Sequence, residues 1–321
     1  MKVFLTGVTG FLGDKLSSRL IKNGHELGCL VRNISTGDKA GNTEELIRGG
    51  NKKGISHYYG DLTDFFTIRD AMRDFKPEII IHLASQTSVA YSFTHPFEVV
   101  QTNLVGTMNM AQAAIEEAPD LKRFVWSGSV EEYGNQKIFP ITEDAPLMAA
   151  SPYAVAKIGS EKYLRYLFDA YKFPIVIFRN ANSYGRLHNH QFVVESMIHQ
   201  MLAKQSVARF GDPEPIRDLI YSDDLLDAYQ KAVESNSEKL HGESINVSTG
   251  FGIAIKDLAE IIAQKTNFQG EIKWNCFPKR SLEIHNLTMD NSKAKKLLNW
   301  EPKYSLDAGL DKTIDWWKQK S

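Results

Sequence analysis

The sequence predicts an α/β fold, in which a doubly wound parallel sheet is joined to a smaller, mixed α+β lobe. Short, nearly continuous apolar segments alternate with amphipathic helical segments as far as residue 179, which is typical of parallel strands buried on both faces. The chain also starts with an apolar segment at residues 2–6, which leads through a glycine-rich turn into a helix ending near residue 23. After residue 179 the pattern becomes mixed, which indicates a separate C-terminal lobe.

Composition and charge argue against several classes of protein. The 321 residues are 42% hydrophobic and 24% charged, as in ordinary globular proteins, and the formal net charge is −1. Such a balance disfavours nucleic acid and anionic membranes as partners. The two cysteines, Cys29 and Cys276, fit a reducing compartment and have no metal-ligand spacing. No signal peptide and no apolar run of the ~20 residues that span a bilayer are apparent, so we expect a cytoplasmic protein without a metal.

The expected elements divide the chain into two parts. In the first part, strands are predicted near residues 2–6, 26–31, 55–59, 78–84, 121–126 and 173–178, and longer helices near 96–117 and 152–172. A polar turn is predicted at 180–186. In the second part, strands are predicted near 217–222, 245–247 and 271–275, and helices are predicted to end near 204 and to span 255–266, 291–298 and 305–318. We expect residues 1–179 to form a Rossmann-like NAD(P)-binding domain, with later returns near 205–247. Residues 180–321 would form an interleaved substrate-binding lobe.

The glycine-rich turn between the first strand and the first helix predicts a dinucleotide site. Its spacing is G-x-x-G-x-x-G, with Gly7, Gly10 and Gly13. Gly7 would permit the tight turn, Gly10 would let backbone N–H groups approach a pyrophosphate, and Gly13 would allow close packing of helix on strand. The alternative is a glycine turn that binds no ligand.

The end of the second strand bears on which dinucleotide is bound. Arg32 stands where an acidic residue would hydrogen-bond the adenosine ribose, and a basic residue there can pair with a 2′-phosphate. We therefore expect NADP, with NAD possible; the alternative is a solvated arginine at a strand end. Residues 33–54 are expected to be a polar loop with a short helix near 44–48. Asp61, after the third strand, could contact the adenine.

The segment at residues 151–157 predicts a proton shuttle. Ser151 can cap a helix and Pro152 suits its first turn, so Tyr153 and Lys157 lie four residues apart on one helical face. The lysine charge favours the phenolate and should lower the pKa of Tyr153 from about 10. Such a phenol can move a proton during an alcohol–ketone interconversion. The alternative is an ordinary tyrosine and lysine on a helix.

Polar residues also follow the strands near 78–84 and 121–126. In a parallel sheet the carboxyl ends of the strands form the ligand-binding edge. Residues 86–88 and 127–134 are therefore expected to lie at an active site, whereas His82 is expected to be a packed strand residue. Asn103 is a polar residue on an otherwise apolar helical face.

Motifs in register across nearly the whole chain resemble the extended short-chain dehydrogenase/reductase superfamily. They are Gly7-x-x-Gly10-x-x-Gly13, Asp61-Leu62-Thr63-Asp64, His82-Leu83-Ala84, Asn103-x-x-Gly106-Thr107, Ser129 before Tyr133-Gly134, Tyr153-x-x-x-Lys157, Arg179-x-x-Asn182 and Arg217-Asp218. The nearest resemblance is to the branch that modifies nucleotide sugars, namely 4,6-dehydratases (including the GDP-mannose type), epimerases and GDP-4-keto-6-deoxy-sugar reductases.

The resemblance implies roles for particular residues. Ser129, Glu131, Tyr153 and Lys157 would be catalytic. Tyr153 and Lys157 would also contact the cofactor, together with Gly7, Thr9, Gly10, Phe11, Leu12, Gly13, Arg32, Asp61, Leu62, Ala84, Gln86 and Asn103. Thr87, Ser88, Ser129, Asn182, Arg217 and Arg280 would bind a nucleoside-diphosphate sugar, the arginines at its phosphates. The resemblance also implies a homodimer that joins helices near 96–117 and 152–172.

The residues that follow Ser129 bear on the reaction. Oxidation at C4 of a sugar acidifies its C5 proton, and a 4,6-dehydratase needs a base to remove that proton. Glu131 matches this base, while Val130 stands where dTDP-glucose dehydratases have an acid. The preferred hypothesis is therefore an NADP-dependent 4,6-dehydratase nearer the GDP-mannose type. A 4-keto-6-deoxy-sugar reductase, a 4-epimerase and a non-catalytic NADP-sensing protein remain alternatives.

Overall fold

The computed structural model describes residues 1–32, 54–187, 189–203, 206–280 and 282–319. The short helix expected near residues 44–48 lies outside them. A parallel sheet with the strand order β10-β6-β5-β4-β1-β2-β3 forms the centre of the molecule. Its strands are β1 (Lys2–Thr6), β2 (Glu26–Val31), β3 (Ile55–Tyr59), β4 (Ile79–His82), β5 (Arg123–Ser129), β6 (Ile175–Asn180) and β10 (Glu243–Val247). This confirms the predicted doubly wound α/β fold.

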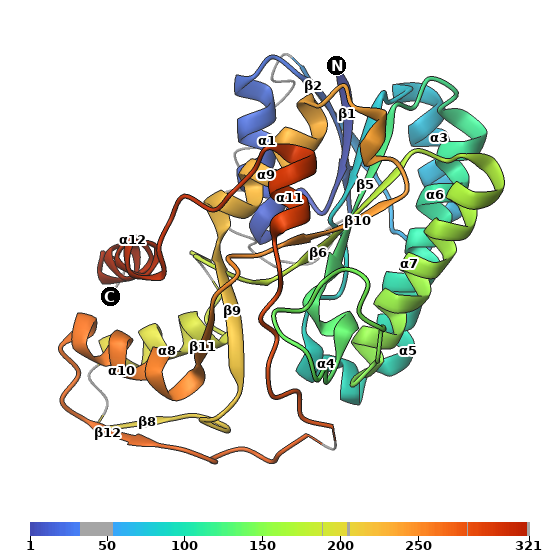
Figure 1. The fold of residues 1–321 in the computed structure, drawn as a ribbon. Helices are drawn as coiled ribbons and strands as arrows, with labels where there is room; N and C mark the ends of the chain where they lie inside the picture. Colours follow the sequence, from blue (N-terminus) through green and yellow to red (C-terminus); the bar gives the residue numbers. More distant parts are fainter. Residues whose placement is uncertain (33–53, 188, 204–205, 281, 320–321) are drawn as a thin grey trace.

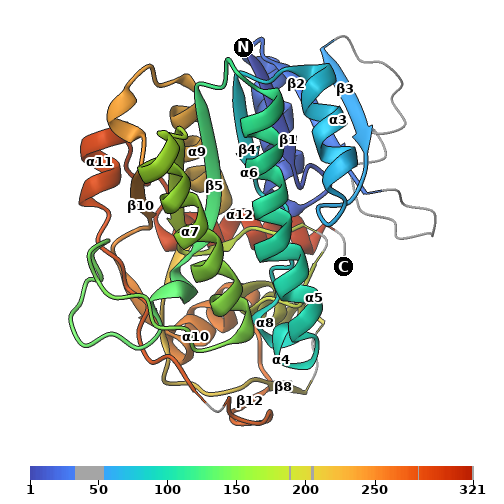
Figure 2. The ribbon, with the colours of Figure 1, turned by 90° about the vertical axis from the view of Figure 1, so that its right-hand side faces the viewer.

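Helices cover both faces of this sheet (Figures 1 and 2). One face carries α1 (Phe11–Lys22), α9 (Ser222–Glu234) and α11 (Ser292–Leu298), and the other carries α3 (Phe65–Phe75), α6 (Gly106–Glu117) and α7 (Pro152–Tyr171). Because β4 is buried at every residue, its sequence is apolar throughout except for His82. The chain progresses in opposite directions from β1 and β4, and the carboxyl ends of these two strands mark the place where ligands bind in such sheets.

The helix expected near residues 96–117 is interrupted. It consists of α5 (Pro96–Val100), a π-helical turn (Gln101–Val105) and α6, and it is preceded by a short helix, α4 (Val89–Thr94), that the sequence analysis did not anticipate. The π-helical turn contains Asn103, which is buried. Such turns are frequent at functional sites because they re-aim side chains.

The smaller lobe lies below the carboxyl edge of the main sheet in Figure 1. It contains a three-stranded sheet of β11 (Gly252–Ala254), β9 (Ile216–Tyr221) and β7 (Asn182–Tyr184), a two-stranded sheet of β8 (Val207–Arg209) and β12 (Glu271–Lys273), and the helices α8 (Val193–Leu202), α10 (Ile255–Thr266) and α12 (Leu306–Lys318). The polar turn predicted at 180–186 was wrong in part. Residues 182–184 pair with β9 as a strand, and Tyr184 is buried.

The chain passes between the two lobes more than once. α9, β10 and α11 follow residue 180 but pack on the main sheet, whereas β8 belongs to the smaller lobe. The division at residue 179 into a cofactor lobe and a substrate lobe remains a prediction.

Candidate active site

A cavity of about 1490 Å³ is lined by residues from both lobes. Twenty of the predicted site residues line it: Gly7, Thr9, Gly10, Phe11, Leu12, Gly13, Arg32, Asp61, Leu62, Ala84, Gln86, Thr87, Ser88, Ser129, Glu131, Tyr153, Lys157, Asn182, Arg217 and Arg280. The fold thus brings residues from distant parts of the chain to one space. Their individual roles remain predictions.

Asn103 is the predicted site residue that does not line the cavity. Its Oδ1 accepts a hydrogen bond from the Gln86 N–H at 2.7 Å, and its Nδ2 donates to the Gln86 carbonyl oxygen at 3.0 Å. Both polar ends of Asn103 are thereby engaged by the backbone of one residue. Asn103 holds the segment after β4 in place, and its expected cofactor contact remains a prediction.

The glycine turn has a shape that suits a dinucleotide. Gly7 has a φ of +75°, and a Cβ at Gly13 would lie 2.0 Å from the Gly7 carbonyl oxygen, so helix α1 packs too closely for any side chain there. Gly10 precedes α1, and no side chain among the described residues caps that end of the helix. The first N–H groups of α1 can therefore bind a phosphate. The residues present fit a nicotinamide dinucleotide.

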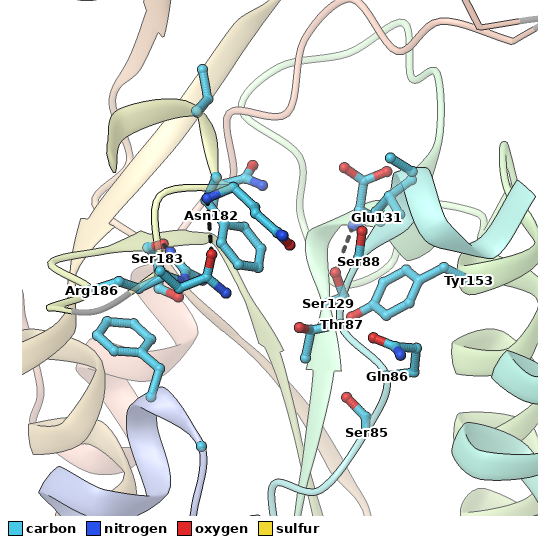
Figure 3. A pocket seen from close by; sticks show the side chains of 18 of the residues that line it. Ser85, Gln86, Thr87, Ser88, Ser129, Glu131, Tyr153, Asn182, Ser183 and Arg186 are labelled. Atoms are coloured by element: carbon cyan, nitrogen blue, oxygen red, sulfur yellow. Dashed lines mark hydrogen bonds between the residues drawn. The ribbon is translucent and has the colours of Figure 1, made fainter. Parts of the chain in front are cut away.

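The catalytic candidates Ser129, Tyr153 and Lys157 all line the cavity, and Figure 3 shows Ser129 and Tyr153 on one wall of it. Tyr153 is 7% exposed and Lys157 is 3% exposed. Lys157 Nζ donates a hydrogen bond to the Ser127 carbonyl oxygen at 2.6 Å and lies 5.8 Å from the centre of the Tyr153 ring. The Tyr153 and Ser129 hydroxyls are hydrogen-bonded to each other. This places an acid–base group and a hydrogen-bonding hydroxyl at one point.

The expected direction of the Tyr153 pKa was wrong for this structure. Burial raises the pKa of Tyr153 above its ordinary value, and the hydrogen bond with Ser129 opposes that rise only in part. Burial also lowers the pKa of Lys157 to about 8, although the charge of Glu132 opposes this shift. For the pKa of Tyr153, the burial of its hydroxyl therefore outweighs the effect of the Lys157 charge that the four-residue spacing suggested.

Glu131 lines the cavity close to Ser129, whose Oγ accepts a hydrogen bond from the Glu131 N–H at 3.2 Å. It is 6% exposed and belongs to the 3₁₀ turn Val130–Tyr133 that follows β5. Burial raises the pKa of Glu131, while the charges of Arg217 and Arg280 act in the opposite direction. A carboxylate with a raised pKa facing a cavity can accept a proton from a ligand.

The opposite wall carries Asn182, Arg217 and Arg280 (Figure 3 shows Asn182). Arg217 is held by the carbonyl oxygens of Ile216 and Ile284 at 2.9 and 3.0 Å. The Asn182 Oδ1 is buried and has no hydrogen-bond partner among the residues that the structure describes. Arg280 is exposed at the rim. Two guanidinium groups and an amide form a suitable set for a diphosphate.

Sequence reasoning missed Arg186, which also lines the cavity. Its guanidinium carbon lies 4.6 Å from the centre of the Phe11 ring and 3.6 Å from that of Phe192, so it bridges the glycine turn and the smaller lobe. Arg186 also forms an ion pair with Glu195 at 3.6 Å. The sequence could have indicated Arg186, because it follows β6 closely and the carboxyl end of that strand lies at the ligand-binding edge of the sheet.

In the part of the chain that the structure describes, no group of three or more His, Cys, Asp or Glu side chains is arranged to hold a metal ion. None of the helices described is both long and apolar enough to cross a bilayer.

Comparison with known proteins identifies the family. The family model for GDP-mannose 4,6 dehydratase matches residues 4–313. The UDP-glucose 4-epimerase of Mycolicibacterium smegmatis is 30% identical over 328 residues, with all of both chains covered. The dTDP-D-glucose 4,6-dehydratase of Mus musculus is 26% identical, covering 99% of this chain and 89% of the relative.

Solved structures agree with this placement. The UDP-glucose 4-epimerase of Thermotoga maritima, solved with UDP-glucose, has a TM-score of 0.87 and 29% identity, covering 100% of this chain and 99% of that one. The UDP-glucose 4-epimerase of Thermus thermophilus, in complex with NAD, has a TM-score of 0.85 and 25% identity, with both chains fully covered. The chain therefore belongs to the GDP-mannose 4,6-dehydratase family, in the nucleotide-sugar branch of the extended short-chain dehydrogenases/reductases.

Proposed function

We propose that this protein is a nucleotide-sugar 4,6-dehydratase that works with bound NADP(H). The observation that carries the proposal is that Glu131 lines the same cavity as Tyr153, Arg217 and Arg280, with its backbone N–H hydrogen-bonded to Ser129 Oγ at 3.2 Å. A nucleoside-diphosphate hexose with its phosphates on the arginines and its sugar at Tyr153 would lay the sugar ring against Glu131. A base at that position is what elimination of water from C5 and C6 requires.

The residues divide the proton movements between them. A bound nicotinamide would supply the capacity to accept a hydride and to return it. The ionised Tyr153 oxygen takes the proton of the sugar 4-hydroxyl, and the Ser129 hydroxyl orients that oxygen. Glu131 then takes the C5 proton, which the C4 ketone has made acidic, and passes it to the 6-hydroxyl, which leaves as water. Lys157 provides positive charge beneath the Tyr153 ring, which favours its ionised form.

The choice of NADP rests on Arg32. It is exposed at the end of β2 and lines the cavity, so its guanidinium can reach a 2′-phosphate. The Thermus thermophilus relative was solved with NAD, so NAD is the alternative cofactor. We also retain the homodimer as a proposal, with α5, α6 and α7 as its contact surface.

A second candidate reaction is 4-epimerisation. Both the relative at 30% identity and the Thermotoga maritima structure are named UDP-glucose 4-epimerases. An epimerase needs no base at C5, so Glu131 would then have only an electrostatic role. A 4-keto-6-deoxy-sugar reductase, which would consume NADPH, is a third possibility, because its sequence also resembles residues 129–134.

Mass spectrometry of the purified protein with GDP-, UDP-, dTDP- and CDP-hexoses tests the proposal directly. No reductant is added. Loss of one water from one of these sugars is the expected result, and it would also identify the nucleotide. An isomer of unchanged mass, resolved by chromatography, would replace the dehydratase with an epimerase. Turnover only of a 4-keto-6-deoxy sugar with added NADPH would indicate a reductase.

The Glu131→Gln variant tests the role of that residue. We expect it to retain C4 oxidation, visible as NADPH absorbance, and to lose water elimination by about 10²- to 10⁴-fold. Glu143→Gln is the matched control, since Glu143 accepts a hydrogen bond from the Asn246 N–H and does not line the cavity. Rapid elimination by Glu131→Gln would contradict the assigned base.

A further inference from the structure

A second carboxylate, Glu132, lies behind the catalytic strand end and has no role in the mechanism above. Its side chain is completely buried, and its Oε1 accepts a hydrogen bond from the Ser129 N–H at 2.6 Å. Lys157 donates to the Ser127 carbonyl oxygen at the same distance of 2.6 Å. Two buried ionisable side chains therefore hold the two ends of the tripeptide Ser127–Ser129, which carries the Ser129 hydroxyl.

Glu132 packs directly against this tripeptide. A Cβ at Gly128 would lie 2.7 Å from Glu132 Oε1 and 2.9 Å from the Phe178 carbonyl oxygen. Glycine at this position leaves room for the carboxylate, and a larger residue would displace it. The position of Glu132 is therefore determined by the strand as well as by its hydrogen bond.

Two cations, Arg179 and Lys157, act on Glu132, and the effect of Arg179 is the larger. The ionisable groups that act on Glu132 come from α7 (Lys157 and Glu161) and from β6 (Arg179). Arg179 is already paired with Glu161, through Nη2 to Oε1 at 2.6 Å and Nε to Oε2 at 3.0 Å. The Glu132 Oε2 is buried and accepts no hydrogen bond from any residue that the structure describes.

Burial of such a carboxylate is costly, and a side chain like leucine would fill the same space without that cost. Burial raises the pKa of Glu132 to about 8, and the charge of Glu161 adds to the rise. The charge of Glu132 in turn raises the pKa values of Lys157 and of Tyr153. Ionisation of Glu132 thus acts on both groups that the proton transfer needs.

We propose that Glu132 is a positioning residue, which holds Ser129 through its backbone and sets the pH range in which Tyr153 and Lys157 work. The inference rests on the proposed function, because it assigns catalysis to those residues. Glutamine at position 132 would keep an acceptor for the Ser129 N–H but remove the charge. Leucine would remove both.

The pH profile of kcat/KM separates these contributions. A carboxylate raises the pKa of each neighbouring group, so Glu132→Gln should move both limbs of the profile to lower pH, by about one unit. Its maximal rate should stay within about tenfold of the wild type. Glu132→Leu should show the same shift and a further loss of kcat, because Ser129 is no longer held. Glu143→Gln is the control and should leave the profile in place.

Nuclear magnetic resonance makes the test independent of turnover. Lysine Nζ labelled with ¹⁵N is titrated in the wild type and in Glu132→Gln, and Lys157→Met assigns the signal. A midpoint for Lys157 that is lower by about one pH unit in Glu132→Gln is expected. An unchanged midpoint would overturn the proposal. If no sugar nucleotide is converted by the wild type while the midpoint still shifts, the proposed function fails and the coupling of Glu132 to Lys157 stands.

Discussion

The wall that carries Ser129 and Tyr153 comes from the main sheet and α7, which also bears Lys157, whereas the facing wall with Asn182 comes from the smaller lobe and its connecting loops (Figure 3). On the first wall, Tyr153 and Lys157 are buried and tied by hydrogen bonds. On the second, Arg280 lies exposed at the rim, and Arg217 is held by the carbonyl oxygens of Ile216 and Ile284, with the Glu283 carboxylate 3.8 Å away.

This difference corresponds to the two tasks of the site. A group that moves a proton must have its pKa set by its surroundings, and burial shifts a pKa far more than an exposed position does. A group that binds a diphosphate needs a permanent charge and access to the ligand, and an arginine near the surface provides both. Changes in the first wall should therefore affect chemistry and folding, and changes in the second should affect binding.

The largest expected effect is that of Tyr153→Phe. The substitution removes one hydroxyl from a buried ring and should lower turnover by about 10³-fold or more, because no other group is placed to move the 4-hydroxyl proton. Initial rates with the sugar nucleotide identified above provide the measurement. Thermal unfolding should change little, and a variant with near-normal turnover would show that Tyr153 is not the acid–base group.

Next is Arg179→Met, which breaks a buried ion pair beneath the first wall. Glu161 would remain buried with only Arg165, which is partly exposed, as a cationic partner, and we expect a loss of about 3 kcal/mol in the free energy of unfolding. Denaturant titration measures it. Arg73→Met, which breaks the exposed pair with Glu117, is the control and should change little. If the two substitutions lowered the free energy of unfolding equally, the buried ion pair would contribute no more to stability than the exposed one, and the prediction would be wrong.

The same pair predicts how stability depends on pH. Burial alone would raise the pKa of Glu161, but hydrogen bonds from Arg179 and Arg165 outweigh it and lower the pKa to about 2. A carboxyl whose pKa is depressed on folding contributes stability above its unfolded pKa, about 4.5, which is lost as the pH falls toward 2. Unfolding measured between pH 5 and 3 should therefore be less pH-dependent in Arg179→Met than in the wild type.

A smaller effect is expected on the second wall. Arg280→Ala should raise KM for the sugar nucleotide about tenfold and leave kcat nearly unchanged, since it removes a charge-assisted contact far from the reacting carbons. Lys279→Ala is the neighbouring control, because Lys279 is paired with Asp212 at 2.8 Å. A fall in kcat without a change in KM would place Arg280 in the chemical step instead.

The smallest effect concerns the cofactor. Arg32→Ala should lower the preference for NADP over NAD by about tenfold or less, because Arg32 is exposed and solvent screens its charge. Equilibrium binding of both dinucleotides, followed by fluorescence, measures the ratio, and Arg73→Ala is a control away from the cavity. A ratio that does not change would assign no part of cofactor selection to Arg32.

Several features could be predicted because their causes are local. The glycine turn follows from the backbone freedom of Gly7 and the close packing at Gly13. Tyr153 and Lys157 share a face because a helix places residues four apart together. The strand at 182–184 was misjudged, since its partner, β9, lies elsewhere in the chain. The hydrogen bonds of Asn103 with the Gln86 backbone were not foreseen for the same reason.

By itself, the sequence determined the alternation of strands and helices, the glycine turn and the identities of the residues that can do the chemistry. These depend on neighbours within a few positions. Only the tertiary structure decided how deeply each of those residues is buried and which charges face it. The pKa of Tyr153 therefore rises instead of falling, and the charge of Glu132 acts on Lys157. Burial and long-range charge are properties of the packed chain, because they arise from segments that meet only after folding.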